Sequence, residues 1–319
     1  MPRGPLSILL LILAQPCAAQ VVRVVATSPE TKQARGGIHR AKLGESVTLH
    51  AMIDGKLVRP ETHPGVRLRW YKVEPKGDSY NNTEGGFHWD VIEYQEHPMG
   101  PWGRKWQMPA DAHPVGYPDV HDGLGTMGFK VAAKIGDKIF SSPGKESIFR
   151  GGLSDKVLRV AFRRDDTFLG YLTELFNTPY IWGSAGYPPE KHQAERLIGS
   201  DCADFIVYGA RRTGKNVPYR GSWHLPLSAV ALAKADRIDS NGRYIQKDGK
   251  TIPVNDDGVH LGDLLLFPGH VGALLQDREP EGVLDINDVM IHTFWAPPTE
   301  EPISKTAYAD SAVQVLRWK

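Results

Sequence analysis

The segment Ser200–Phe205, with the sequence SDCADF, decides how this chain is interpreted, because it holds one of only two cysteines, Cys202. The other, Cys17, lies in an apolar stretch at the N-terminus. If that apolar stretch is removed on export, Cys202 is the only cysteine left in the mature chain. Exported proteins usually pair their cysteines in disulfides, so a single thiol suggests that its sulfur does chemistry. The alternative is a buried cysteine that serves as a small apolar residue.

The first twenty residues are typical of a signal peptide. Arg3 precedes an apolar run over residues 6–14, and Cys17-Ala18-Ala19 resembles a cleavage site. The run is too short to span a bilayer, and no later stretch is long and apolar enough to do so. We therefore expect a secreted or periplasmic protein with no integral membrane segment in the mature chain. Lipid modification of Cys17 is an alternative that Pro16 disfavours.

The charge composition argues against a nucleic-acid partner. The sequence has 38 Lys and Arg against 37 Asp and Glu, with a formal net charge of +1. Phosphate binding needs clustered basic residues, and the sequence has no such block. His88-x-Asp90 and His121-Asp122 lack further ligands at metal-binding spacing, and residues 239–242 favour a surface turn over a calcium loop. We expect no cofactor and no metal.

Residues 21–150 are expected to form an all-β domain. The stretches 44–51 and 66–73 alternate apolar and polar residues, which places Trp70 inward. Residues 122–132 lead into a predicted hairpin over residues 133–140, which turns at Gly136-Asp137. A strand bearing a tryptophan, followed by a later strand bearing Phe129, resembles an immunoglobulin-like sandwich, here without cysteines between its sheets.

After a linker at 141–152, residues 155–319 change to an α+β pattern. Apolar residues in 165–176 have helical spacing, and the helix is expected to end before Pro179. A second helix is expected from Cys202 to about Arg212, capped by Ser200 or Asp201. Four strands are then predicted, at Leu264–Phe267, Val271–Gln276, Val289–Phe294 and Ala312–Trp318.

The position of Cys202 in the first turn of a helix predicts a lowered thiol pKa, because the free N–H groups there favour the thiolate. A thiol nucleophile also needs an imidazole as acid and base. His270 follows a Pro-Gly turn at the start of a predicted strand, and His292 lies on the next strand, where it can orient the His270 ring. The alternative is that both are ordinary sheet histidines.

Three blocks of sequence occur in the order found in the NlpC-type cell-wall cysteine peptidases. They are Thr178–Ser184 (TPYIWGS), Asp201–Phe205 (DCADF), and Gly262–Gly272 (GDLLLFPGHVG) followed by Ile291-His292. Residues 165–319 thus resemble this family, and the resemblance implies a papain-like catalytic domain.

The resemblance also implies residue roles. Cys202 would be the nucleophile, His270 the general base and acid, and His292 the third member of the triad. Tyr180 would assist the oxyanion with the Cys202 backbone N–H, Asp201 would receive a substrate amine, and Trp182 would shape the cleft.

The expected function is therefore hydrolysis of an amide bond in peptidoglycan stem peptides, of the D-glutamyl–diamino acid type, through an acyl-enzyme. The family usually has Ser-Gly after its nucleophile, whereas this chain has Ala203-Asp204, and the segments 185–199 and 277–288 look like insertions. These departures leave two alternatives open. One is a papain-like amidase or acyltransferase with another substrate, and the other is an adhesion or binding protein whose hydrolase half is vestigial.

Overall fold

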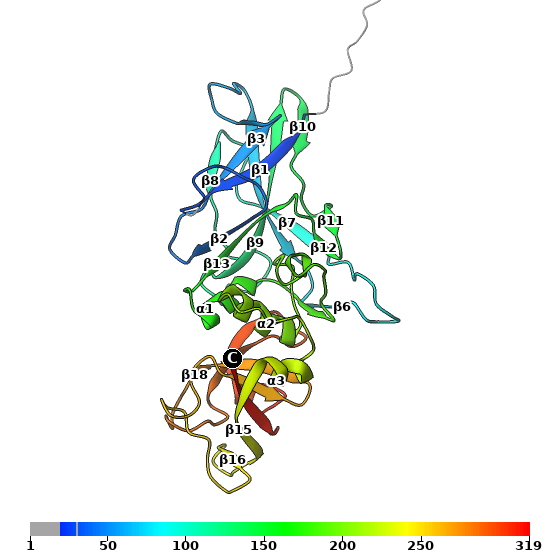
Figure 1. Cartoon of the computed structure of the whole chain (residues 1–319). Coiled ribbons are helices and arrows are strands. Elements are labelled where there is room, and N and C mark those ends of the chain that lie inside the picture. The colour runs from blue at the N-terminus through cyan, green and yellow to red at the C-terminus, as the bar shows by residue number, and fades with distance from the viewer. Residues whose placement is uncertain (1–19, 30) are drawn as a thin grey trace, which may run out of the picture.

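The structure is a computed structural model that describes residues 20–29 and 31–319. The expected signal peptide up to residue 19, with Cys17, lies outside the described residues. The fold is mixed α+β, with many strands and few, short helices (Figure 1). Its N-terminal half is built from strands, and its C-terminal half places helices against a further sheet.

The N-terminal half consists mainly of one smaller and one larger sheet. The smaller sheet contains β1 (Val22–Thr27), β3 (Thr48–Ile53), β4 (Lys56–Leu57) and β8 (Gln107–Pro109). The larger sheet has the order β2 (Ile38–Lys42), β13 (Leu158–Arg163), β9 (Gly125–Ile135), β5 (Arg67–Pro75) and β7 (Tyr94–Pro98), with β10 (Lys138–Ser141) paired to β9. A short hairpin, β11 (Ile148–Phe149) and β12 (Gly152–Leu153), follows.

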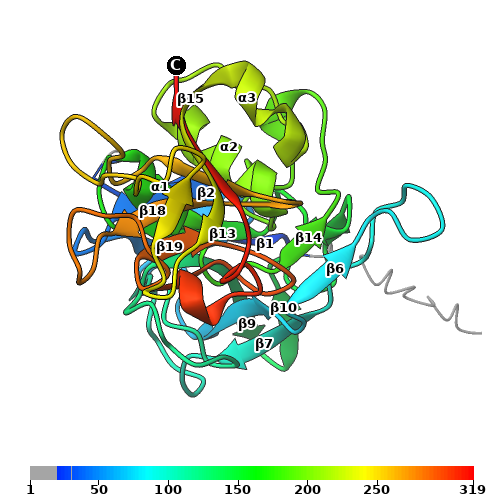
Figure 2. The same ribbon diagram turned by 90° about the horizontal axis from the view of Figure 1, so that it is seen from below.

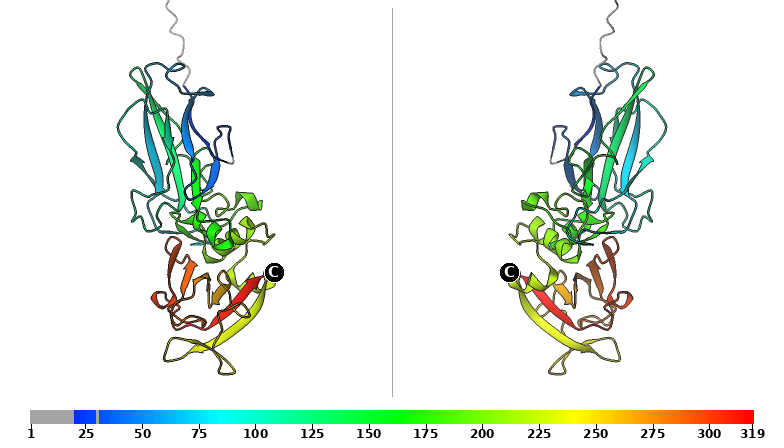
Figure 3. Two further views of the ribbon diagram at one scale, coloured as in Figure 1. Left: turned by 90° about the vertical axis from the view of Figure 1, so that its left-hand side faces the viewer. Right: turned by 90° about the vertical axis from the view of Figure 1, so that its right-hand side faces the viewer.

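These two sheets pack face to face, as the side views in Figure 3 show. The alternation predicted for residues 66–73 is confirmed, because Leu68 and Trp70 on β5 are buried in the core between the sheets. Phe129 on β9 is buried there as well. The predicted hairpin is also confirmed: β9 and β10 pair antiparallel around Gly136 and Asp137.

Strand β13 extends the N-terminal half beyond residue 150. It pairs antiparallel with β9 and parallel with β2, so it lies inside the larger sheet. The boundary expected between residues 150 and 155 therefore lies too early in the sequence. Strand β13 still belongs to the larger sheet, and the chain leaves this sheet only after Arg163.

The C-terminal half places its helices on one side of an antiparallel sheet. The helical segments are α1 (Phe168–Leu172), α2 (Cys202–Arg212) and α3 (Leu225–Ser228), with 3-10 turns at Thr173–Leu175, Pro189–Lys191, Ser222–His224 and Ile303–Lys305. The sheet has the order β16 (Tyr244–Gln246), β15 (Ala229–Ile238), β21 (Val313–Trp318), β17 (Leu264–Phe267), β18 (His270–Gln276), β19 (Val289–His292) and β20 (Thr299–Pro302).

Helix α2 is the buried centre of this half. Its residues from Cys202 to Ala210 are all buried, and Phe205 and Ile206 share a core with Val271 and Ile291 of the sheet. The predicted span of this helix is confirmed. The helix expected in residues 165–176 is shorter, because α1 tightens into a 3-10 turn at Thr173 and Phe176 is already extended.

A strand pairing joins the two halves beside α2. Strand β6 (Ser79–Asn81) of the N-terminal half runs parallel to β14 (Tyr180–Trp182), with Tyr180 opposite Ser79. Figure 2 shows β6 and β14 side by side, with the loop after β6 projecting from the molecule. The buried carboxylate of Glu174 adds a second connection, because it meets Arg40 of β2 and Arg212 of α2. The N-terminal half is thus attached directly to the segment that precedes Cys202.

Candidate active site

Cys202 is the first residue of α2, and local capping fixes it there. The side chain of Asp201 accepts a hydrogen bond from the backbone N–H of Asp204 at 2.9 Å, which satisfies one of the free donors at the helix start. The expected capping role of Asp201 is therefore confirmed. Cys202 is a free cysteine and only 3% exposed.

His270 and His292 are hydrogen-bonded to each other in the neighbouring sheet. His270 begins β18, His292 ends β19, and these strands pair antiparallel, so the two residues lie at the same end. Nε2 of His270 is 3.0 Å from Nδ1 of His292. Nε2 of His292 is in turn 3.1 Å from Oε1 of Glu301 on β20. Three polar side chains thus form a continuous chain across the sheet edge.

The sulfur of Cys202 lies beside strand β18. The backbone N–H of Val271, the residue after His270, lies near enough to the Cys202 sulfur to favour its thiolate form. Nδ1 of His270 is buried and has no hydrogen-bond partner among the described residues, so it is not hydrogen-bonded to Cys202 either. The structure therefore brings Cys202, His270 and His292 into one cluster, with one imidazole nitrogen left free. In enzymes without bound substrate, catalytic hydrogen bonds are often long and tighten only when substrate binds.

The expected lowering of the Cys202 pKa is wrong for this structure. Burial, followed by the nearby charge of Asp201, raises the pKa of Cys202 to about 12. Burial, and then the neighbouring His292, lower the pKa of His270 to about 2. The helix start still contributes N–H groups, but removing the sulfur from water outweighs them. The resting pair is a neutral thiol and a neutral imidazole.

Aromatic rings enclose this cluster. His270 stacks on Tyr308, with ring centroids 4.6 Å apart, and its ring also lies 5.0 Å from that of Phe294. Burial, followed by the charge of a Cys202 thiolate, raises the pKa values of Tyr180 and Tyr308, so both hydroxyls lie in the neighbourhood of the sulfur. The Tyr180 hydroxyl is buried without a hydrogen-bond partner in the described part of the chain. It is therefore a free donor close to the nucleophile.

A cavity of about 490 Å³ opens on Cys202. Its lining includes Trp182, which is 37% exposed and stacks on Trp295 at 5.9 Å. Trp223 and Tyr219 add two further aromatic walls. Trp182, which the sequence predicts to shape the cleft, thus lies in the lining of the cavity that contains Cys202.

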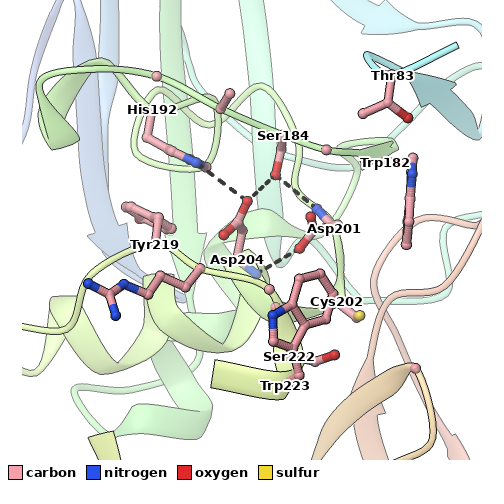
Figure 4. Close-up of a pocket in the computed structure, with 17 residues that line it drawn as sticks. Thr83, Trp182, Ser184, His192, Asp201, Cys202, Asp204, Tyr219, Ser222 and Trp223 are labelled. Carbon is pink, nitrogen blue, oxygen red and sulfur yellow. Dashed lines mark hydrogen bonds and ion pairs between the residues drawn. The ribbon is translucent and has the colours of Figure 1, made fainter. Parts of the chain in front are cut away.

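Acidic groups occupy the floor of the cavity on the other side of the helix start (Figure 4). Asp204 accepts hydrogen bonds from the Ser184 hydroxyl at 2.5 Å, and its carboxylate lies 3.4 Å from Nε2 of His192. Burial raises the pKa of Asp201 to about 6, and burial together with the Asp201 charge raises the pKa of Asp204. Asp204 thus places a second carboxyl group next to that of Asp201 at the start of the helix.

The N-terminal half contributes one wall of the cavity. Thr83, just after β6, lines it. The buried Asn82 side chain donates hydrogen bonds to the carbonyl of Gly183 at 3.1 Å and to Gln193 at 2.9 Å. A Cβ added at Gly183, which has a φ of +67°, would lie 2.5 Å from the Thr83 methyl group. The cavity is therefore assembled from both halves of the chain.

Several site residues could not be recognised from the sequence. Glu301 and Tyr308 lie in a Pro- and Glu-containing stretch with no strand pattern, and Thr83 reaches the site only through the β6–β14 pairing. The sequence does give a signal for Asp204, because Ala203-Asp204 follows Cys202 where the NlpC-type pattern has Ser-Gly.

No helix among the described residues has the length and apolar character needed to cross a bilayer. Among residues 20–29 and 31–319, no group of three or more His, Cys, Asp or Glu side chains is arranged to hold a metal ion. Comparison of the chain with models of known protein families, with curated proteins and with solved structures gave no match.

Proposed function

We propose that this chain is an exported cysteine hydrolase that cleaves an amide bond in the peptide stem of peptidoglycan. One observation carries the proposal: a cysteine at the start of a buried helix lies against the strand that begins with His270, and His270 is hydrogen-bonded to His292. A thiol, a free imidazole nitrogen and a group that orients the ring are the parts that nucleophilic acyl transfer requires.

The finer fold assignment is part of the same proposal. A helix that begins with the nucleophile and packs on an antiparallel sheet carrying the histidines supports a papain-like, NlpC-type catalytic domain. Two sheets packed face to face, with Trp70 and Phe129 buried between them, support an immunoglobulin-like N-terminal domain.

The reaction begins with a neutral pair. As the Cys202 sulfur attacks the substrate carbonyl carbon, its proton passes to Nδ1 of His270, and the carbonyl oxygen becomes an oxyanion. The Tyr180 hydroxyl and the N–H groups at the start of α2 can stabilise that oxyanion. His270 then returns the proton to the leaving amine, which yields a thioester. Water, deprotonated by His270, releases the acid product and restores the thiol.

The substrate class rests on the resemblance of residues 165–319 to the NlpC-type peptidases, and a D-glutamyl–diamino acid bond is the expected target. The carboxyl oxygens of Asp201 and Asp204 on the cavity floor can accept hydrogen bonds from a substrate amine near the scissile bond. Peptidoglycan stems carry such amines, and an exported enzyme would meet them outside the cytoplasm.

The alternatives predict different behaviour. An amidase or acyltransferase with another substrate would use the same cluster and leave muropeptides intact. A binding protein with a vestigial hydrolase half would not need Cys202, His270 and His292 to lie in one cluster, and this observation favours an enzyme.

The test is digestion of purified muropeptides, with product masses read by mass spectrometry. The wild-type protein should yield fragments cut between the second and third residues of the stem, whereas Cys202→Ala should yield none while keeping the wild-type melting temperature. Cleavage that persists in Cys202→Ala would overturn the proposal. Intact muropeptides with the wild-type protein would exclude this substrate class.

A further inference from the structure

We infer that Glu301 is a positioning residue that determines, through His292, which ring nitrogen of His270 carries the proton. The inference rests on the proposed function in one respect, namely that His270 serves as the base for Cys202. The geometry concerns the chain His270–His292–Glu301, in which Glu301 is the outermost member.

Strand pairing places Glu301 beside His292. On the β19–β20 ladder, Met290 is opposite Glu301 and His292 is opposite Thr299. Glu301 is therefore a diagonal neighbour of His292 on the same face of the sheet. The neighbouring Glu300 points to the other face, where it forms an ion pair with Arg164. The two adjacent glutamates thus have different surroundings, and only one of them meets a histidine of the cluster.

The donor and acceptor roles follow from the carboxylate. An ionised carboxylate can only accept, so Nε2 of His292 must carry a proton and donate it to Glu301. In a neutral His292 ring, Nδ1 then has a lone pair and accepts from Nε2–H of His270. A neutral His270 protonated on Nε2 has its lone pair on Nδ1. Nδ1 is the His270 nitrogen that has no hydrogen-bond partner among the described residues and is therefore free to accept the proton of Cys202.

The packing around His270 leaves the hydrogen-bonded chain His270–His292–Glu301 to determine which nitrogen of the His270 ring is protonated. His270 is fully buried, and its ring packs against those of Tyr308 and Phe294. Those rings fix its orientation but offer Nδ1 and Nε2 no competing hydrogen bond. Glu301 is partly exposed, with 32% of its side chain accessible, so it can be exchanged without opening the core.

Replacing the Glu301 carboxylate by a hydrogen-bond donor should therefore reverse the direction of the hydrogen bonds along the chain His270–His292–Glu301. In Glu301→Lys, the ammonium group can only donate, so Nε2 of His292 must accept and its Nδ1–H must donate to His270. His270 would then carry its proton on Nδ1 and could not take one from Cys202. Glu301→Gln keeps a carbonyl acceptor of the same length and should keep the wild-type arrangement.

The experiment measures the ring-nitrogen ¹⁵N chemical shifts of histidine-labelled protein at neutral pH, with His270→Asn and His292→Asn used for assignment. Wild type and Glu301→Gln should show His270 protonated on Nε2 alone, and Glu301→Lys should show it protonated on Nδ1. Glu300→Gln, which changes the adjacent carboxylate, should match wild type. In parallel, muropeptide cleavage should fall by about 10²-fold or more in Glu301→Lys and remain within about tenfold of wild type in Glu301→Gln.

The outcomes separate this inference from the proposed function. A wild-type His270 protonated on Nδ1 would overturn the inference, and so would a folded Glu301→Lys variant with unchanged shifts. If the tautomer reverses as expected but wild type cleaves no muropeptide, the inference holds and the proposed substrate fails. If wild type cleaves muropeptides and Glu301→Lys does so at the same rate, Glu301 has no positioning role.

Discussion

The backbone N–H of Val271 lies near the sulfur of Cys202, so the start of helix α2 and the start of strand β18 come together there. His270 immediately precedes Val271, and the polar chain to His292 and Glu301 leads away from that point. A nucleophile and its base are thus positioned by elements of regular structure rather than by loops, which favours precise geometry.

The buried state of Cys202 gives a prediction for its reactivity. Because burial and then Asp201 raise the thiol pKa to about 12, the rate of alkylation by iodoacetamide should keep increasing from pH 7 to pH 10. An exposed cysteine, with a pKa of about 8.5, levels off above that value. Asp201→Asn removes the second cause and should increase the rate at pH 8 several-fold. A plateau below pH 9 in the wild-type protein would contradict the assignment of a neutral resting thiol.

The Tyr180 hydroxyl should matter for catalysis and not for stability. Tyr180→Phe should lower kcat by about 10²–10³-fold, as loss of one oxyanion donor does elsewhere. The free energy of unfolding should stay the same or rise by about 1 kcal/mol, because a buried hydroxyl without a partner is unfavourable.

Tyr244 offers a matched control for that variant. It is fully buried on β16, at the opposite edge of the sheet, and its hydroxyl also lacks a partner among the described residues. Tyr244→Phe should change stability in the same direction and leave kcat unchanged. Equal kcat losses in both variants would show that Tyr180 acts through packing alone.

The contact between Thr83 and Gly183 can be tested with a double-mutant cycle. Gly183→Ala adds a Cβ at a φ of +67° and within 2.5 Å of the Thr83 methyl group. It should destabilise the protein by about 1–2 kcal/mol from backbone strain alone and by more from the clash. Adding Thr83→Ser removes that methyl and should restore the steric part, with a coupling of about 0.5–3 kcal/mol from urea unfolding. Additive effects would indicate that the two halves do not meet at this wall.

His192 should make the protein sensitive to acid. Burial lowers its folded-state pKa to about 3, whereas an unfolded histidine titrates near 6.5. Between these values the unfolded chain binds the proton and the folded chain does not, so stability is full above pH 6.5 and declines toward pH 3. In urea unfolding, His192→Gln should lose less stability than wild type between pH 7 and pH 4.5, by up to about 3 kcal/mol. Parallel curves for the two proteins would contradict this linkage.

Features encoded by neighbouring residues could be predicted from the sequence. The cap at Asp201, the start of the helix at Cys202 and the strand Leu264–Phe267 depend on local pattern, and the structure confirms them. The hairpin around Gly136 is of the same kind. Local hydrogen bonding and side-chain alternation are sufficient to specify such elements.

Features that depend on distant contacts could not be predicted. Strand β15 has the alanine-rich sequence AVALAKADRI, which carries no strand signal, and its pairing with β21 overrides its weak local preference. The positions of Glu301 and Thr83 likewise follow from strand pairing across the fold. The Cys202 pKa was predicted in the wrong direction, because the helix start is visible in the sequence and the depth of burial is not.

The parallel pairing of β6 with β14 has a consequence for recombination of this chain. A hybrid that joined residues 164–319 to an unrelated N-terminal module would lose Ser79–Asn81 as the neighbour of Tyr180–Trp182, together with the Asn82 side chain that ties down the carbonyl of Gly183. The two portions therefore cannot be exchanged as independent cassettes and must be inherited or engineered as a single unit.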